Sequence, residues 1–419
     1  MTAISVLLSS GGASTFATAS VTRYGGLCTG SNFVAGAQST EATAQVYTGI
    51  VGTLSNFYVT LGTNSRASSS TSFKVRKNTA NGNLTVTFAA STAGSQTDTT
   101  HTDVLAIGDL INNSIATGSG TGSIAVALTG VNFRPLNSTV VAFGRGSSGS
   151  TLTGTGPIND YISFAGPGND GATVTIGNAQ ALAPIGGTAS YFQAKVPTNT
   201  RTGDSVFSFN INGSNGAQTF TFATTETALK EDTTNSDTLA VNDLVAIQVA
   251  LANASTGVLA IDMNAWWYNS ATDGKFWCVG QNTVGVAAST TAYMPISGRI
   301  TSSATELDSK GEVGLAGTAK NLWIKVSTNA STTDAALRFR INGGYGNQNV
   351  TITALTTGPF QDTSNSDTFV ATDLLCYEMS GQTTGSVTWT AYTMEIDVVV
   401  LPMPRGLSIF QAVNRASTY

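Results

Sequence analysis

The sequence has almost none of the side chains on which most enzyme active sites depend. It contains one histidine, His101, and three cysteines, Cys28, Cys278 and Cys376, among 419 residues. A Ser-His-Asp or Cys-His centre needs a histidine as its base, and a histidine-rich zinc site needs several. An odd number of cysteines cannot complete a set of intrachain disulfides, so we expect buried free thiols. We therefore expect neither an enzyme nor a cofactor.

Charge is equally scarce. Charged residues make up 10% of the chain, whereas an ordinary soluble domain has about 25%. The net charge is −5, and the 19 lysines and arginines are scattered along the sequence. Nucleic-acid binding needs clustered Lys and Arg, so we expect no nucleic-acid partner. Because the hydrophobic fraction is 41%, the low charge indicates a folded chain and not a disordered one.

Long apolar runs are also missing. No stretch approaches the roughly 20 apolar residues of a membrane-spanning helix. Residues 1–8 lack the basic start and long apolar core of a secretion signal. We expect no membrane partner. What is abundant is glycine, with 45 residues, alongside threonine, serine, asparagine and alanine, and this composition favours strands and turns.

One pattern of residues occurs three times. An Asp-Thr-x-x-x-Asp hexad begins at Asp98, Asp232 and Asp362, and each hexad is followed at constant distance by an Asp-Leu pair. A strand-like segment that ends in asparagine precedes each hexad, at 73–78, 207–212 and 337–342. This recurrence predicts three tandem copies of one unit. His101 stands where the other copies have asparagine, so we expect it to be a turn residue.

Within each copy, apolar and polar residues alternate with a period of two. Phe57, Val59 and Leu61 are the first example. This alternation is typical of antiparallel sheets with one buried face, and the Asn212-Gly213 dipeptide favours a hairpin. The sequence therefore predicts an all-β fold of three tandem antiparallel β-sandwich, jelly-roll-like domains. The expected domains are 1–135 with an N-terminal arm, 136–270 and 271–400, followed by a C-terminal arm at 401–419.

The repeated aspartates are the strongest candidate for a binding site. Carboxylates with nearby Asn and Thr oxygens are ligands that Ca²⁺ accepts, although no EF-hand spacing is present. The alternative is that each aspartate bonds nearby backbone amides in Asx-turns. Recurrence in all three copies favours this structural role over acid/base catalysis. The calcium candidates are Asp98, Asp103, Asp109, Asp232, Asp237, Asp243, Asp362, Asp367 and Asp373.

Aromatic residues gather in one part of the chain: Trp266, Trp267, Phe276 and Trp277. On a surface they would form a platform for stacking sugars. Packing in a core or between domains is the alternative, because aromatic side chains dominate both settings.

The order of signals in each copy resembles small β-domains of phage structural proteins, which are akin to the C1q/TNF-like jelly rolls. The resemblance is carried by the strand ending in Asn-Gly, the Asp-Thr-x-Asn-x-Asp hexad and the turn Gly108-Asp109-Leu110. It implies a virion protein that contacts the major capsid protein and other virion proteins. It also implies assembly, either as a homo-oligomer or as a pseudo-trimer of the three copies within one chain.

Two roles remain open for such a protein. One is a decoration or cement protein on the outer surface of a phage head. The other is a fibre or tail-associated receptor-binding protein that recognises host surface glycans, for which the aromatic cluster would be the binding surface.

Overall fold

The chain forms three sandwiches of antiparallel strands, so the all-β prediction is confirmed. The described residues contain no α-helix, and short 3-10 turns such as η1 (Glu41–Thr43) and η2 (Ile176–Asn178) lie between strands. Within that same part of the chain, no helix is long and apolar enough to cross a membrane. The computed structural model describes residues 6–16, 19–27, 39–48, 51–135, 140–145, 150–153, 155–163, 175–252, 255–261, 263–272, 274–299, 302–306, 309–312, 316–370 and 372–398.

The first sandwich has two facing four-stranded sheets. One sheet has the order β1-β9-β4-β7 and the other β2-β8-β5-β6, with β3 also paired to β8. Most connections pass from one sheet to the other, which is the double-sheet arrangement of a jelly roll. The strands are β1 (Val6–Phe16), β2 (Thr22–Gly25), β3 (Val46–Tyr47), β4 (Gly52–Asn64), β5 (Thr71–Lys77), β6 (Ala80–Phe88), β7 (Gly94–Leu105), β8 (Leu110–Thr117) and β9 (Ile124–Pro135).

The second sandwich repeats this arrangement. Its sheets have the orders β10-β21-β14-β18 and β12-β19-β16-β17, with β13 beside β19, and a small third sheet is ordered β11-β20-β15. The strands are β10 (Val140–Arg145), β11 (Ser150–Leu152), β12 (Ile158–Ile162), β13 (Ala181–Leu182), β14 (Gly187–Val196), β15 (Thr198–Asn199), β16 (Ser205–Ile211), β17 (Ser214–Phe222), β18 (Ala228–Leu239), β19 (Leu244–Leu251), β20 (Leu259–Ile261) and β21 (Met263–Ser270).

The third sandwich follows the same plan. Its sheets have the orders β24-β22-β31-β26-β29 and β23-β30-β27-β28, with β25 beside β30. The strands are β22 (Lys275–Val286), β23 (Ala292–Met294), β24 (Gly298–Arg299), β25 (Gly311–Glu312), β26 (Gly317–Asn329), β27 (Ala335–Ile341), β28 (Gly344–Ile352), β29 (Gly358–Phe369), β30 (Leu374–Ser380) and β31 (Val387–Val398).

The chain ends differ from the expected arms where they are described. Residues 6–16 and 22–25 are not an arm but form strands β1 and β2. Strand β1 pairs with β9 in one sheet of the first sandwich. The expected C-terminal arm at 401–419 and Cys28 lie outside the described residues. The other two cysteines, Cys278 and Cys376, are buried free thiols.

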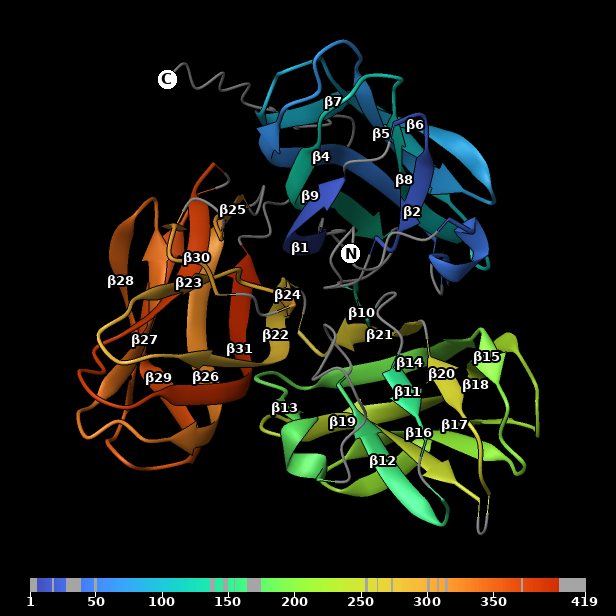
Figure 1. Cartoon of the computed structure of the whole chain (residues 1–419). Coiled ribbons are helices and arrows are strands. Elements are labelled where there is room, and N and C mark those ends of the chain that lie inside the picture. Colours follow the sequence, from blue (N-terminus) through green and yellow to red (C-terminus); the bar gives the residue numbers. More distant parts are fainter. Residues whose placement is uncertain are drawn as a thin grey trace.

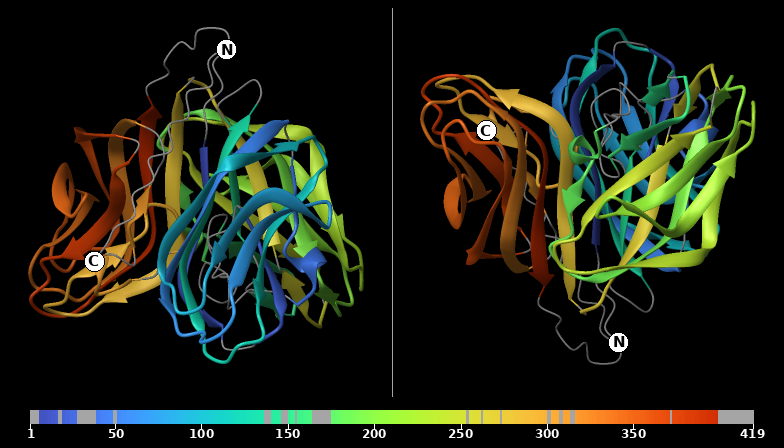
Figure 2. Two further views of the ribbon diagram at one scale, coloured as in Figure 1. Left: turned by 90° about the horizontal axis from the view of Figure 1, so that it is seen from above. Right: turned by 90° about the horizontal axis from the view of Figure 1, so that it is seen from below.

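The three sandwiches surround a common centre, with β1, β10 and β22 on their inner sides (Figure 1). Seen from above or below, the third sandwich, coloured orange to red, lies beside the other two (Figure 2). Strand β1 contacts both β10 and β24, so the first sandwich contacts the other two. The three therefore form a single body.

Aromatic side chains join neighbouring sandwiches. Phe133 on β9 packs edge-on against Trp267 on β21, with ring centroids 5.6 Å apart. Trp277 on β22 lies 5.7 Å from Tyr268 and 6.3 Å from Trp266, both on β21. The hydrophobic core of the second sandwich is thereby continuous with that of the third.

The contacts between sandwiches repeat at equivalent positions. Phe133 and Tyr268 occupy the same place in their sheets, since they pair with Leu54 and Ala189 of the equivalent strands β4 and β14. Trp267 and Glu395 are likewise equivalent, through Ser190 and Lys320. Trp267 packs on Phe133, and Tyr268 packs on Trp277, which pairs with Glu395 in the neighbouring strand. Both interfaces therefore join residues at the same level of their sheets.

Removing an aromatic ring between sandwiches should loosen both of its neighbours. Trp277→Ala should lower the free energy of unfolding by about 3–5 kcal/mol, because it removes a large buried side chain and leaves a cavity. Calorimetry should show a lower unfolding temperature, and hydrogen exchange should show weaker protection of backbone amides in both the second and the third sandwich. The exposed Leu355→Ala is the control and should change neither; loss of protection confined to the third sandwich would contradict the interpretation.

Candidate functional site

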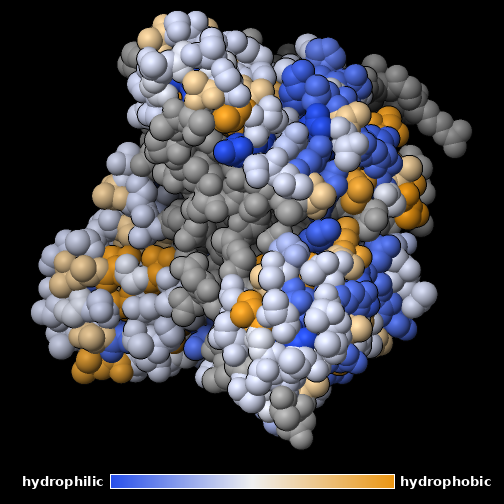
Figure 3. All heavy atoms as spheres, turned by 45° about the vertical axis from the view of Figure 1, so that its right-hand side comes forward, coloured by the Kyte–Doolittle hydropathy of each residue, from blue (hydrophilic) through white to orange (hydrophobic). Residues whose placement is uncertain are grey.

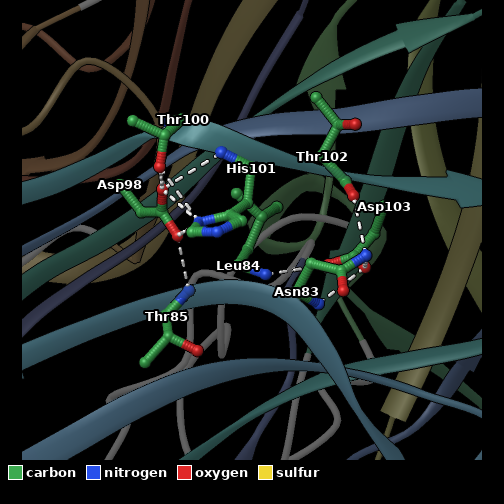
Figure 4. Close-up of polar contacts among 8 residues, drawn as sticks. All are labelled: Asn83, Leu84, Thr85, Asp98, Thr100, His101, Thr102 and Asp103. Atoms are coloured by element: carbon green, nitrogen blue, oxygen red, sulfur yellow. Dashed lines mark hydrogen bonds and ion pairs between the residues drawn. The ribbon is translucent and has the colours of Figure 1, made fainter.

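The repeated aspartates lie where the two sheets of each sandwich meet at their edges. Asp98 and Asp103 are on β7, the last strand of its sheet, and their carboxylates reach β6, the last strand of the facing sheet (Figure 4). The same placement recurs on β18 and β17, and on β29 and β28. An edge strand presents unpaired backbone N–H groups. These carboxylates bond them.

The first aspartate of each hexad stabilises a β-bulge in its own strand. One residue of β4, Asn56, faces three residues of β7, because Ser55 pairs with Thr102 while Phe57 pairs with Asp98. Asn56 has φ 51°, and the equivalent residues Tyr191 and Asn321 have φ 53° and 55°. Such a bulge removes backbone amides from the ladder. The Asp98 carboxylate accepts two of them, from Thr100 at 3.1 Å and His101 at 3.2 Å.

The other oxygen of that carboxylate crosses to the facing sheet. Asp98 Oδ2 accepts from the Thr85 amide at 2.9 Å. The equivalent bonds run from Thr219 to Asp232 at 3.0 Å and from Asn349 to Asp362 at 2.9 Å. One carboxylate therefore shapes β7 and joins it to β6.

The second aspartate of each hexad accepts hydrogen bonds from two further amides of the facing strand. Asp103 accepts from the amides of Asn83 at 2.8 Å and Leu84 at 3.3 Å. A side chain at Gly82 would place its Cβ 2.4 Å from Asp103 Oδ2. The same clash would occur between Gly216 and Asp237, and between Gly346 and Asp367. Glycine is required at this position because the carboxylate fills the space of a side chain.

The third aspartate, in the Asp-Leu turn, joins two turns at one end of the sandwich. Asp109 accepts from the Ala106 amide at 2.6 Å and from Asn78 Nδ2 at 2.7 Å, and Lys77 Nζ lies 3.0 Å away. Asn78 also has a positive φ, which suits its place in the hairpin. The asparagine contact recurs between Asn212 and Asp243 and between Asn342 and Asp373, each at 2.7 Å.

Hydrogen bonding keeps the first aspartates ionised. Burial alone would raise the pKa of Asp98, but bonds from the Thr85 and Thr100 amides and from His101 outweigh it, and the pKa is lowered. The pKa values of Asp232 and Asp362 are lowered in the same way, with Asn235 and Asn365 donating in the place of His101.

His101 thus has the geometry of a turn residue. Its Nδ1 lies 2.9 Å from Asp98 Oδ2, where the Nδ2 groups of Asn235 and Asn365 also lie 2.9 Å from their aspartates. Its ring is largely exposed, at 59% of the side chain.

The aspartates are not gathered as a cation site would gather them. Their oxygens accept hydrogen bonds from N–H groups, whose positive ends stand where a calcium ion would have to bind. Among the described residues, no group of three His, Cys, Asp or Glu side chains is arranged to hold a metal ion. Each triplet therefore acts as a clamp, by which we mean that its carboxylates bind backbone N–H groups of neighbouring strands and turns.

The expectation of a surface sugar platform is wrong. Trp266, Trp267, Phe276 and Trp277 are all buried, with at most 3% of each residue exposed. They pack within the cores and between sandwiches because large aromatic rings gain most by leaving water. This is the alternative role that the sequence left open.

One further clamp was missed in the sequence. Asn64, Asn199 and Asn329 each donate two bonds to carbonyls of the turn before the hexad strand, for example Asn64 to Ala89 and Thr92 at 3.0 and 2.8 Å. Two of these asparagines are followed by the fully buried Arg66 and Arg201, whose guanidinium groups bond carbonyls of the next loop. The near-constant spacing of the asparagines from the hexads could have revealed them.

The clamp should be visible in the dependence of stability on pH. Because the folded-state pKa of Asp232 is lowered, its contribution is present above the unfolded pKa of about 4 and is lost as the pH falls through the folded value. Asp232→Asn should cost about 1–3 kcal/mol at pH 7. The difference from wild type should shrink as the pH falls below about 4, as measured by denaturant titrations across pH.

Asp160 supplies the matched control for that experiment. Burial raises its pKa, so its ionised form is disfavoured in the folded state and its effect on stability has the opposite slope. The free energy of unfolding of Asp160→Asn should therefore fall relative to that of wild type as the pH falls. Parallel pH profiles for the two variants would argue against the clamp.

The glycine that faces the clamp can be tested separately. Gly82→Ala should lower the free energy of unfolding by about 1–3 kcal/mol, because the methyl group displaces Asp103 from the Asn83 and Leu84 amides. Gly62→Ala on β4 is the control, since its nearest neighbour would be the Ala125 carbonyl at 4.0 Å. Equal losses in the two variants would show that strand glycines matter only for their backbone.

Comparison with known proteins adds little. No family model matches the chain, and no curated protein is similar to it. A chain from the atomic structure of Sulfolobus Turreted Icosahedral Virus aligns with 84% of this chain and 82% of its own length, at 10% identity and a TM-score of 0.17. A TM-score of that size carries no argument about fold or function.

Proposed function

We propose that this chain is a non-enzymatic virion structural protein that decorates the outer surface of a phage head and binds its major capsid protein. The observation that carries the proposal is that the repeated polar motifs are committed to the chain's own backbone, in a body whose three sandwiches are joined by buried contacts. Such a molecule offers shape and rigidity more than reactive groups.

The strand order supports the resemblance that suggested this role. Each sandwich pairs its first strand with its last, as β1 pairs with β9 and β22 with β31, and faces this sheet with a second of four main strands. This order supports the likeness to double-sheet jelly rolls. Three such units around one centre would act as a pseudo-trimer within a single chain.

The surface also suits a structural role. Figure 3 shows a face on which many of the described atoms have intermediate hydropathy, with hydrophilic atoms gathered toward the right-hand side and smaller, separate hydrophobic patches. With only 10% of residues charged, contacts to a shell would depend on shape complementarity and small neutral side chains.

The alternative is a fibre or tail-associated protein that binds host glycans. Its motivation was an exposed aromatic platform, and the residues that would form it are buried. Decoration is therefore the better-supported role.

The copy number in the virion tests the choice. Quantitative mass spectrometry of purified particles should find this chain in hundreds of copies relative to the major shell protein. A dozen copies or so would favour a vertex or tail fibre. Absence from purified particles would contradict both roles.

A further inference from the structure

One end of the three-sandwich body carries nearly all of its exposed large apolar side chains. The end is defined by the turns that hold Asp109, Asp243 and Asp373, and we refer to it as the Asp-Leu end. Of the exposed large hydrophobic residues in the described part of the chain, only Leu355 lies elsewhere, between β28 and β29 at the opposite end. The others are Val51, Val104, Ile107, Val241, Tyr345 and Val370.

Their positions follow from the turn contacts. Ile107, Val241 and Val370 lie in the turns just before Asp109, Asp243 and Asp373, and are 57% to 59% exposed. Val51 precedes Gly52, which pairs with the last residue of β7, and Val104 lies one residue before that strand end. Tyr345 follows the hairpin turn whose Asn342 bonds Asp373.

The same turn opens at the same end in all three sandwiches. Contacts between sandwiches join residues at equivalent levels, because Phe133 packs against Trp267 while Tyr268 packs against Trp277, which pairs with Glu395. With these levels matched, the three sandwiches lie around one central axis (Figure 1). Each sandwich presents an exposed β-branched apolar residue around this axis: Ile107, Val241 and Val370.

The charges at this end indicate the class of partner. Lys77 contacts Asp109, Lys310 contacts Glu306, and Arg340 lies between Glu306 and Glu378. Nucleic acids and anionic lipid surfaces attract free cations, whereas these cations already have carboxylate partners. Apolar tips beside neutralised charges fit an uncharged protein surface.

We infer that the Asp-Leu end is the docking face of the molecule, and that its partner is a protein surface on which three equivalent apolar contacts surround one axis. This inference rests on the proposed function, in which that surface is a site in the shell where three protein copies meet. Three weak contacts made together bind far more tightly than one, because the second and third form at high effective concentration.

The test measures binding to shell particles assembled without this chain. Ile107→Ser, Val241→Ser and Val370→Ser are made singly and together, and bound copies are counted by co-sedimentation. Each single change should weaken binding about tenfold and the triple change at least a hundredfold. Leu355→Ser, equally exposed at the opposite end, is the matched control and should bind like wild type. Unchanged unfolding temperatures show that the variants are folded.

The outcomes separate this inference from the proposed function. Wild-type binding with an inert triple variant supports both. If wild type binds and the triple variant binds equally, or if Leu355→Ser is the variant that fails, the docking face is wrong and the decoration role stands. No binding by wild type overturns the decoration role and the inference with it. Binding to phosphatidylcholine vesicles is measured in parallel. If wild type binds these vesicles and the triple variant loses that binding as fully as it loses binding to shell particles, the choice of a protein partner is wrong.

Discussion

Each sandwich depends on hydrogen bonds from the backbone of one edge strand to carboxylates on another. A two-sheet sandwich leaves open edges, and unpaired amides at an edge invite pairing with other chains. Here Asp98 and Asp103 accept the amides of Asn83, Leu84 and Thr85, so that β6 and β7 close against each other without forming a ladder. The bonds, the bulge and the facing glycine recur in all three sandwiches.

The interfaces between sandwiches are less uniform than the clamps. One equivalent position on the last strand of each sandwich (β9, β21 and β31) holds Asn132, Trp267 and Glu395 respectively. Trp267 makes an apolar contact, whereas Glu395 is buried beside Lys275 and Lys320 at 3.0 and 3.4 Å. Joining the copies in one chain permits this difference, which identical subunits around an axis could not have.

The sequence predicts those features that depend on local pattern. Alternating residues predicted the strands, and the recurrence of Asp98, Asp232 and Asp362 predicted three equivalent units whose aspartates bond nearby amides. The position of Trp266 and Trp267 could not be predicted, because burial there depends on how separate sandwiches meet. Nor does local pattern show that Asp103 reaches the facing sheet, since Asn83 and Leu84 come close only after both sheets fold. Local pattern predicts an arm at the N-terminus, whereas residues 6–16 form a strand, because its partner β9 is far away in the sequence.

That last pairing affects how the chain is made. Val6 pairs with Phe133, so the first strand has no partner until the ribosome has synthesised the whole first unit. At elongation rates of roughly 5–20 residues per second, this takes on the order of ten seconds. By then the hairpin of β5 and β6 and the strands around it are already complete. The first strand is therefore the last to join its sheet, and until β9 is made the nascent chain carries β1 as an unpaired strand with which a neighbouring nascent chain could pair.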